Sequence, residues 1–152
     1  MNLCLNMFKL DNYNVGRHAE FMVVSFLDVF GWKSSLAPGS RGLFDIKSAK
    51  SNRKMCTQVK YRTKPDYPFD SINDQKADML NHSRRCACVP ILAFITRMGD
   101  LLHTNQYSRH HEYKFLIMNC DNRLAWIQVG QDHIMQLINI RTGGILDTND
   151  LA

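Results

Sequence analysis

Two short segments of alternating polarity constrain the fold of this chain more than any other feature. Leu43–Ser48 and Lys54–Tyr61 each alternate between polar and apolar side chains, which is the period of a half-buried β-strand. The residues between them are polar and turn-prone, with Ser51 and Asn52 at the centre. The sequence therefore predicts a β-hairpin in which the numbers of facing residues add up to 103.

That register predicts which side chains of the hairpin lie together. It places Asp45 directly opposite Gln58 and diagonal to Lys60, with all three on one face. Directly opposed Cβ atoms in a sheet are about 4.5–5.5 Å apart, and diagonal ones about 7–8 Å. A carboxylate, an amide oxygen and an ammonium group would then converge, and one metal ion with oxygen ligands would bridge Asp45 and Gln58.

This pattern resembles the PD-(D/E)XK nuclease superfamily, which includes restriction enzymes and archaeal Holliday-junction resolvases. Phe44-Asp45 stands for the PD pair, and Gln58-Val59-Lys60 stands for the (D/E)XK triplet. The proline that Phe44 replaces has no chemical role. The acid that Gln58 replaces does have one, because a neutral amide ligates a hard cation without adding charge. The substitution is therefore expected to lower metal affinity.

Two flanking segments extend the resemblance. Gly16–Glu20 resembles the first helix of resolvase-like members, which carries a glutamate ligand, and Ser83–Phe94 resembles the helix-to-strand step after their catalytic strand. The glutamine in the triplet and the spacing of the motifs most closely resemble homing endonucleases encoded in cyanobacterial group I introns. That resemblance implies a tetramer acting on a long, nearly palindromic DNA site.

The resemblance implies an α/β fold with a restriction-endonuclease-like core, in which helices flank a central mixed sheet. It implies one nuclease domain over residues 1–152, with the core at 16–96 and an extension at 97–152 for DNA readout or oligomerisation. It further implies hydrolysis of DNA with Mg²⁺ or Mn²⁺, by a homotetramer built as a dimer of dimers. The catalytic residues and metal ligands that it implies are Glu20, Asp45, Gln58 and Lys60, with the carbonyl of Val59 as a further ligand.

Basic side chains gather around the predicted hairpin. Residues 33–64 hold nine lysines or arginines and one acid, a charge of +8, whereas the whole chain carries +5 and the remainder therefore −3. Such a patch favours double-stranded DNA as the partner, although an ordinary solvated hairpin is the alternative. The residues predicted to contact DNA are Lys33, Ser40, Arg41, Lys47, Lys50, Arg53, Lys54, Arg62, Lys64, Arg109 and His110.

Length and cysteine usage narrow the class of protein. A chain of 152 residues fits one domain, and no apolar run approaches the ~20 residues of a membrane span. The five cysteines include no CxxC pair, which argues against a disulfide framework or a zinc finger. Cys86 and Cys88 are interpreted as core thiols. A cytoplasmic protein without a signal peptide or a small-molecule cofactor is therefore expected.

The remaining pattern predicts further elements. Residues 16–31 are predicted to form a helix that is apolar nearly all round and therefore buried, and Ser71 with Asp74 predicts a capping box for a helix ending near Arg85. Val89–Thr96 is predicted to be a buried central strand. The last predicted elements are strands at Tyr113–Met118 and Leu124–Val129 and a helix at Gln131–Arg141.

Two questions stay open at this stage. Glu20 lies on an apolar helix face, where its carboxylate needs either an ion pair with Arg17 or Lys60 or a metal ion. The function also has three candidates: a site-specific homing endonuclease, a Holliday-junction resolvase, and a DNA-binding module whose nuclease site lapsed with the change to Gln58. His103, His110 and His111 are interpreted as loop residues near DNA.

Overall fold

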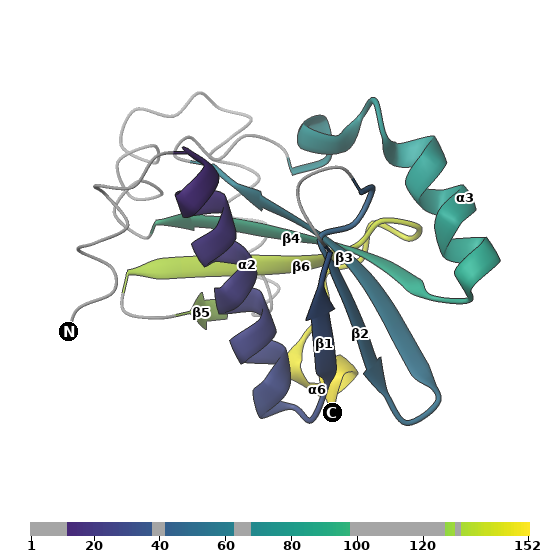
Figure 1. Cartoon of the computed structure of the whole chain (residues 1–152), viewed down its shortest axis with the longest axis horizontal. Helices are drawn as coiled ribbons and strands as arrows, with labels where there is room; N and C mark the ends of the chain where they lie inside the picture. Colours follow the sequence, from purple (N-terminus) through teal and green to yellow (C-terminus); the bar gives the residue numbers. More distant parts are fainter. Residues whose placement is uncertain (1–11, 38–41, 63–67, 98–126, 130–131) are drawn as a thin grey trace.

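The computed structural model describes residues 12–37, 42–62, 68–97, 127–129 and 132–152 (Figure 1). Its helices are α2 (Asn12–Val29), the 3₁₀-helix η1 (Pro68–Ile72), α3 (Lys76–Cys86) and α6 (Thr148–Leu151). Its strands are β1 (Lys33–Leu36), β2 (Ile46–Lys50), β3 (Arg53–Tyr61), β4 (Val89–Arg97), β5 (Ile127–Val129) and β6 (His133–Asn139). No helix in these ranges is long and apolar enough to cross a membrane.

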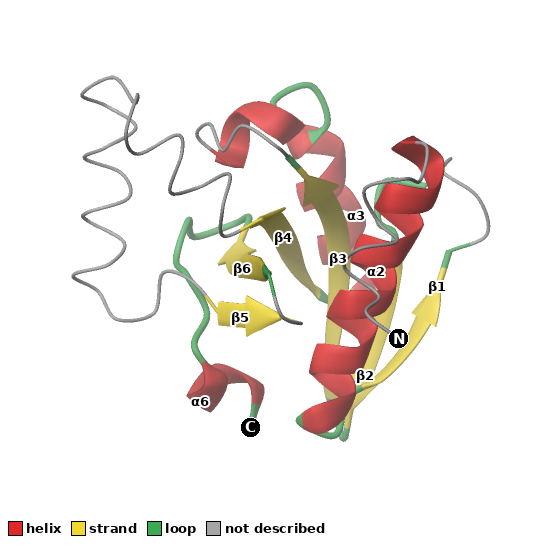
Figure 2. Cartoon of the chain, turned by 90° about the vertical axis from the view of Figure 1, so that its left-hand side faces the viewer, coloured by secondary structure: helices red, strands yellow, loops and turns green. Residues whose placement is uncertain are grey.

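The strands form one six-stranded sheet in the order β1-β2-β3-β4-β6-β5. Only β3 and β4 run parallel, joined through α3, whereas the other neighbours are antiparallel. Helix α2 packs on one face of this sheet and α3 lies on the other (Figure 2). The predicted α/β fold, a central mixed sheet flanked by helices, is confirmed.

The predicted hairpin is present as β2 and β3. Its pairs run from Lys50↔Arg53 to Ile46↔Thr57, and each pair adds up to 103 as predicted. Successive residues of β3 point to opposite faces, so that Val59 joins the core beneath α2 and Cys56 joins the core beneath α3. The predicted central strand is also confirmed, because β4 is buried from Pro90 to Thr96 between β3 and β6.

The prediction of a helix at Gln131–Arg141 is wrong, because this segment contains strand β6. Its residues pair with β4 from Ile91↔Asn139 to Arg97↔His133. Residues 133–138 are all buried, because Leu137 lies in the core beneath α2 and Ile138 in the core beneath α3. A strand buried on both faces is a continuous apolar run, which periodicity alone does not distinguish from a helix.

Both predicted helices need correction at their surfaces or ends. Helix α2 is not buried all round, because Phe21 and Val29 are 51% and 79% exposed. Helix α3 begins after Gln75 with no side-chain cap, and Ser71 lies in η1, so the capping box at Ser71 is wrong. Sequence reasoning also missed α6, although Asp147 and Asp150 form a capping box there.

The prediction of free core thiols is also wrong for the described cysteines. Cys56 on β3 forms a disulfide with Cys88, which lies just before β4. Cys86 is a free thiol and is exposed rather than part of the core. The predicted strand at Tyr113–Met118 and most of Leu124–Val129 fall outside the described residues, whereas β5 agrees with the last three residues of the second strand.

Candidate active site

The backbone leaves the regular ladder of the hairpin at Asp45. The N–H of Asp45 donates to the carbonyl of Thr57 at 2.8 Å, although Thr57 is already paired with Ile46. Two residues of one strand thus oppose one residue of the other, which is the pattern of a β-bulge. The prediction that Asp45 directly opposes Gln58 is therefore wrong, because the bulge redirects the Asp45 side chain.

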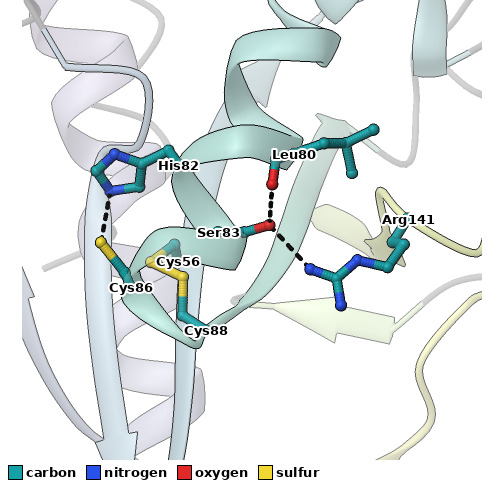
Figure 3. The surroundings of a disulfide bond; sticks show 7 residues. All are labelled: Cys56, Leu80, His82, Ser83, Cys86, Cys88 and Arg141. Carbon is teal, nitrogen blue, oxygen red and sulfur yellow. Dashed lines mark hydrogen bonds between the residues drawn. A yellow bond between two sulfur atoms is a disulfide. The ribbon is translucent and has the colours of Figure 1, made fainter.

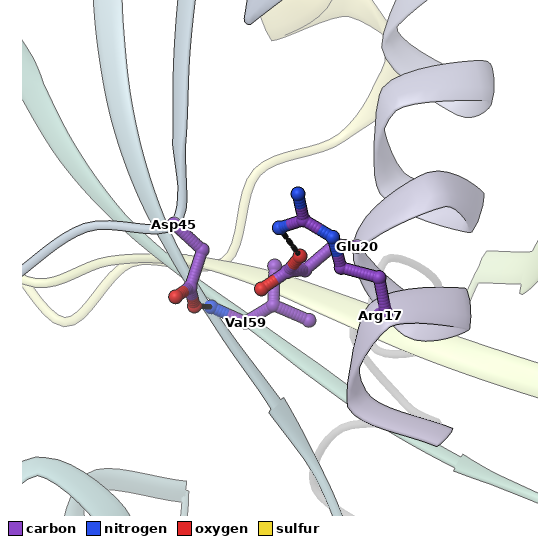
Figure 4. Close-up of polar contacts among 4 residues, drawn as sticks. All are labelled: Arg17, Glu20, Asp45 and Val59. Atoms are coloured by element: carbon purple, nitrogen blue, oxygen red, sulfur yellow. Dashed lines mark hydrogen bonds and ion pairs between the residues drawn. The ribbon is translucent and has the colours of Figure 1, made fainter. Parts of the chain in front are cut away.

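The redirected carboxylate contacts the backbone of β3. Oδ2 of Asp45 accepts a hydrogen bond from the N–H of Val59 at 2.8 Å (Figure 4). Burial raises the pKa of the Asp45 carboxyl above its usual range, while the Val59 hydrogen bond and the charges of Lys60 and Arg17 act in the opposite direction. Asp45 is thus a half-buried carboxylate that is held in one orientation.

Glu20 reaches the same region from helix α2. Its Oε2 forms an ion pair with Arg17 Nη1 at 2.8 Å, one turn earlier on the helix (Figure 4). Burial raises the pKa of Glu20, the hydrogen bond from Arg17 lowers it, and the nearby charge of Asp45 raises it further. Of the two alternatives for Glu20, the ion pair with Arg17 is present, and it occupies one oxygen of the carboxylate.

Lys60 supplies the cationic group of the cluster. It lies on β3 next to Val59 and is half-buried. Burial lowers the pKa of its ammonium group, the charge of Arg62 lowers it further, and the charge of Asp45 raises it. The charge of Asp45 thus acts on the pKa values of both Lys60 and Glu20.

Gln58 lies on β3 two residues before Lys60, on the same face of the strand. Its side chain is 8% exposed, and its Oε1 has no hydrogen-bond partner in the structure. A buried carbonyl oxygen without a partner costs free energy of about 1–3 kcal/mol, which a bound cation would offset. This orphaned oxygen fits the predicted role of Gln58 as a metal ligand.

The donor set suits a hard cation. Two carboxylates and an amide oxygen are the ligand types that Mg²⁺ and Mn²⁺ take. Among the described residues, no group of three His, Cys, Asp or Glu side chains is placed to hold a metal. The predicted site therefore depends on Gln58 as its third side-chain oxygen.

Arg17 also belongs to this cluster, although the sequence analysis gave it no role of its own in the site. Its guanidinium pairs with Glu20 and also acts on the pKa of Asp45. A signal for it exists in the sequence, because a basic residue three positions before a glutamate on a helix faces that glutamate.

The predicted DNA contacts that the structure describes separate into three groups. Lys50 and Arg53 donate instead to backbone carbonyl groups, Lys50 to those of Phe30 and Leu151 and Arg53 to that of Ala152. Arg62 is exposed beside Lys60. Lys33, Lys47 and Lys54 are exposed and line one pocket. The other predicted contacts, Ser40, Arg41, Lys64, Arg109 and His110, lie outside the described residues, as do His103 and His111.

Comparison with known proteins adds little to this geometry. No family model and no curated protein matches the chain. Among solved structures, the chain is similar to Hjc, a Holliday junction resolvase from the archaeal hyperthermophile Archaeoglobus fulgidus, with 15% identity and a TM-score of 0.44. The similarity covers 53% of this chain and 64% of the resolvase, which is less than two thirds of its length.

Proposed function

We propose that this chain is a metal-dependent DNA endonuclease of the PD-(D/E)XK class. The observation that carries the proposal is the half-buried Asp45 carboxylate, which the β-bulge and the Val59 N–H orient and whose charge acts on Lys60 and Glu20. Clusters of half-buried groups with shifted pKa values are typical of active sites, because desolvation is costly without a use. The motif resemblance supports the same class.

Asp45, Gln58 and Glu20 would hold the divalent cation, Mg²⁺ or Mn²⁺, with the carbonyl of Val59 as a further ligand. When bound, such an ion polarises a phosphoryl oxygen and lowers the pKa of a bound water. Two observations support this donor set: Gln58 Oε1 is buried without a hydrogen-bond partner, and the carboxylates of Glu20 and Asp45 act on each other electrostatically.

Lys60 is proposed to position the attacking water and to stabilise the charge that develops on the phosphate. Burial lowers the pKa of Lys60 toward neutral pH, and a group with such a pKa gives up and accepts a proton more readily. Arg17 is proposed to orient Glu20 and does not contact the phosphate in this scheme.

Two substitutions test the chemistry. Lys60→Ala and Asp45→Asn are each expected to lower the cleavage rate by at least about 10³-fold, while DNA affinity stays within a few-fold because phosphate contacts dominate binding. Single-turnover cleavage and a filter-binding assay measure the two quantities on the same DNA. Arg84→Ala, which removes an exposed cation on α3 outside the predicted DNA contacts, is the matched control. Near-normal cleavage by either site variant would rule out this site.

The substrate has two candidates. The motif spacing favours a homing endonuclease acting on one long, nearly palindromic duplex site, while a Holliday-junction resolvase would read the shape of a four-way junction with the same chemistry. The described fold favours neither. Incubation with linear duplex libraries and with synthetic junctions, each with Mg²⁺, decides between them by which DNA is cut. Binding without cleavage of either would instead identify the lapsed DNA-binding module.

The assembly and compartment belong to the same proposal. One catalytic cluster cuts one strand, so a double-strand break calls for at least two copies around a two-fold axis. The resemblance to intron endonucleases supports a homotetramer, a dimer of dimers, in the cytoplasm.

A disulfide in a cytoplasmic protein is usually transient and either catalytic or redox-sensing. The Cys56–Cys88 bond is therefore unusual for the proposed compartment.

A further inference from the structure

A pocket of about 480 Å³ opens beside strands β2 and β3, on the face of the sheet opposite helix α2. Its lining includes the three cysteines of the described chain, Cys56, Cys86 and Cys88. Three lysines on β1, β2 and β3 also line it, namely Lys33, Lys47 and Lys54, and no described acidic residue does. A disulfide, a free thiol and a cluster of positive charge therefore share one cavity.

The free thiol has a base beside it. Cys86 Sγ lies 3.4 Å from Nε2 of His82, one turn earlier on α3 (Figure 3). A thiol paired with an imidazole is the arrangement that activates a cysteine nucleophile, because the imidazole accepts the thiol proton. Cys86 is exposed, whereas Cys56 and Cys88 are only 4% and 5% exposed, so the pocket is the route by which a reagent reaches the disulfide.

We infer that this pocket is a thiol–disulfide exchange site for small anionic thiols, with Cys86 as the internal nucleophile. The inference is independent of the proposed nuclease function. Positive charge in a partly enclosed cavity raises the local concentration of an anionic reagent and therefore its rate of reaction. Exchange requires a thiolate that attacks a disulfide sulfur, and the pocket brings both partners together.

The exchange is balanced without an oxidant or a reductant. The incoming thiolate attacks Cys88 Sγ, the disulfide breaks, and its electron pair leaves on Cys56 Sγ, which takes a proton from water. Cys86 then loses its proton and attacks Cys88 Sγ, and the reagent is expelled as a thiolate that takes up a proton. The net change replaces the Cys56–Cys88 bond by a Cys86–Cys88 bond and releases Cys56 on β3.

Peptide mapping follows these bonds directly. Trypsin releases Cys56 in peptide 55–60 and both Cys86 and Cys88 in peptide 86–97. The full chain, purified without reductant, is expected to give these two peptides joined. Limited exposure to a thiol, followed by acid quenching and alkylation, is expected to give free 55–60 together with 86–97 carrying an internal disulfide. Absence of the joined pair in the purified chain would overturn the inference.

Three probes of similar size and different charge test the role of the lysines. They are 2-mercaptoethanesulfonate, which is anionic, 2-mercaptoethanol, which is neutral, and cysteamine, which is cationic. After correction for thiolate fraction, the rates of opening are expected to fall in that order, by about tenfold from first to last at low salt, and to converge at high salt. Equal corrected rates at low salt would overturn the inference.

Variants separate the pocket from general reactivity. The combined change Lys33→Gln, Lys47→Gln and Lys54→Gln is expected to abolish the charge order, whereas Arg84→Gln with Arg85→Gln, two exposed arginines on α3 outside the pocket, is expected to keep it. Cys86→Ser is expected to accumulate the mixed disulfide on Cys88, because its internal nucleophile is gone. The same products from Cys86→Ser as from the natural chain would exclude Cys86 as the nucleophile.

Discussion

At position 58 a neutral amide occupies the place that an acid holds in the superfamily motif. Gln58→Glu is expected to tighten Mg²⁺ binding by about tenfold, because a charged ligand replaces a neutral one in the same position. Isothermal titration calorimetry measures the change, and Gln75→Glu, an exposed glutamine at the start of α3, is the matched control. Identical affinities for the natural chain and Gln58→Glu would remove Gln58 from the ligand set.

The ionised carboxylate of Asp45 lowers the stability of the fold, and the size of this effect depends on pH. Its pKa is raised in the folded state, chiefly by burial, so its stabilising contribution is full below its unfolded pKa and is lost as the pH rises through its folded pKa. Asp45→Asn keeps an oxygen for the Val59 N–H and removes the charge. In buffers with a chelator, we therefore expect Asp45→Asn to melt higher than the natural chain at pH 7.

The difference in melting temperature between Asp45→Asn and the natural chain is expected to shrink as the pH falls toward 4. Differential scanning calorimetry at several pH values measures it, and Asp74→Asn reports the effect of removing one exposed charge. A variant that melts lower than the natural chain at pH 7, or by a constant difference at every pH, would contradict the argument.

The candidate site was predictable from the sequence for some of its residues and not for others. Asp45, Gln58 and Lys60 follow from two alternating segments and a motif, since alternation decides which side chains share a face. The β-bulge at Asp45 did not follow, because nothing in the local sequence requires two residues to oppose Thr57. The Arg17–Glu20 pair was one of two open alternatives that only the packed helix decides.

Among the secondary-structure elements, helix α3 ends with an unfavourable C-cap residue. Its C-cap, Ala87, has a φ of 53°, in the left-handed region that favours glycine. Ala87→Gly is expected to stabilise the fold by about 0.5–1 kcal/mol, whereas Ala77→Gly inside the same helix is expected to destabilise it by about the same amount. Chemical denaturation of both variants measures this, and changes of the same sign would show that the cap is not strained.

Strand β6 shows why the prediction of a helix at Gln131–Arg141 failed although the apolar spacing was helical. Ile134, Leu137 and Ile138 recur at helical spacing, yet His133 just before them and Gln136 among them are fully buried as well. β4 offers backbone N–H and C=O groups along its edge, and β6 pairs with it over the whole length from Ile91 to Arg97. Satisfying those buried backbone groups outweighs the weak helical preference of a short segment.

The whole molecule raises the question of copy number. The apolar side chains of Phe21, Val29 and Val89 are 51%, 79% and 40% exposed, which leaves apolar surface uncovered on a single copy. Light scattering at micromolar concentration is expected to give four times the chain mass of 17.6 kDa for the free protein, and that mass plus the mass of the DNA for the complex. The mass of one copy in both states would contradict the proposed assembly.

The sequence by itself determined the hairpin, its register, the central strand and the identity of the chemical groups, because alternation and turn chemistry act over a few residues. The tertiary structure decided the rest. It turned an apolar run into β6, joined Cys56 to Cys88, and assigned Lys50 to the C-terminal helix rather than to open surface. Each of these depends on a partner far away in the chain, and such contacts leave no periodic signal in the local sequence.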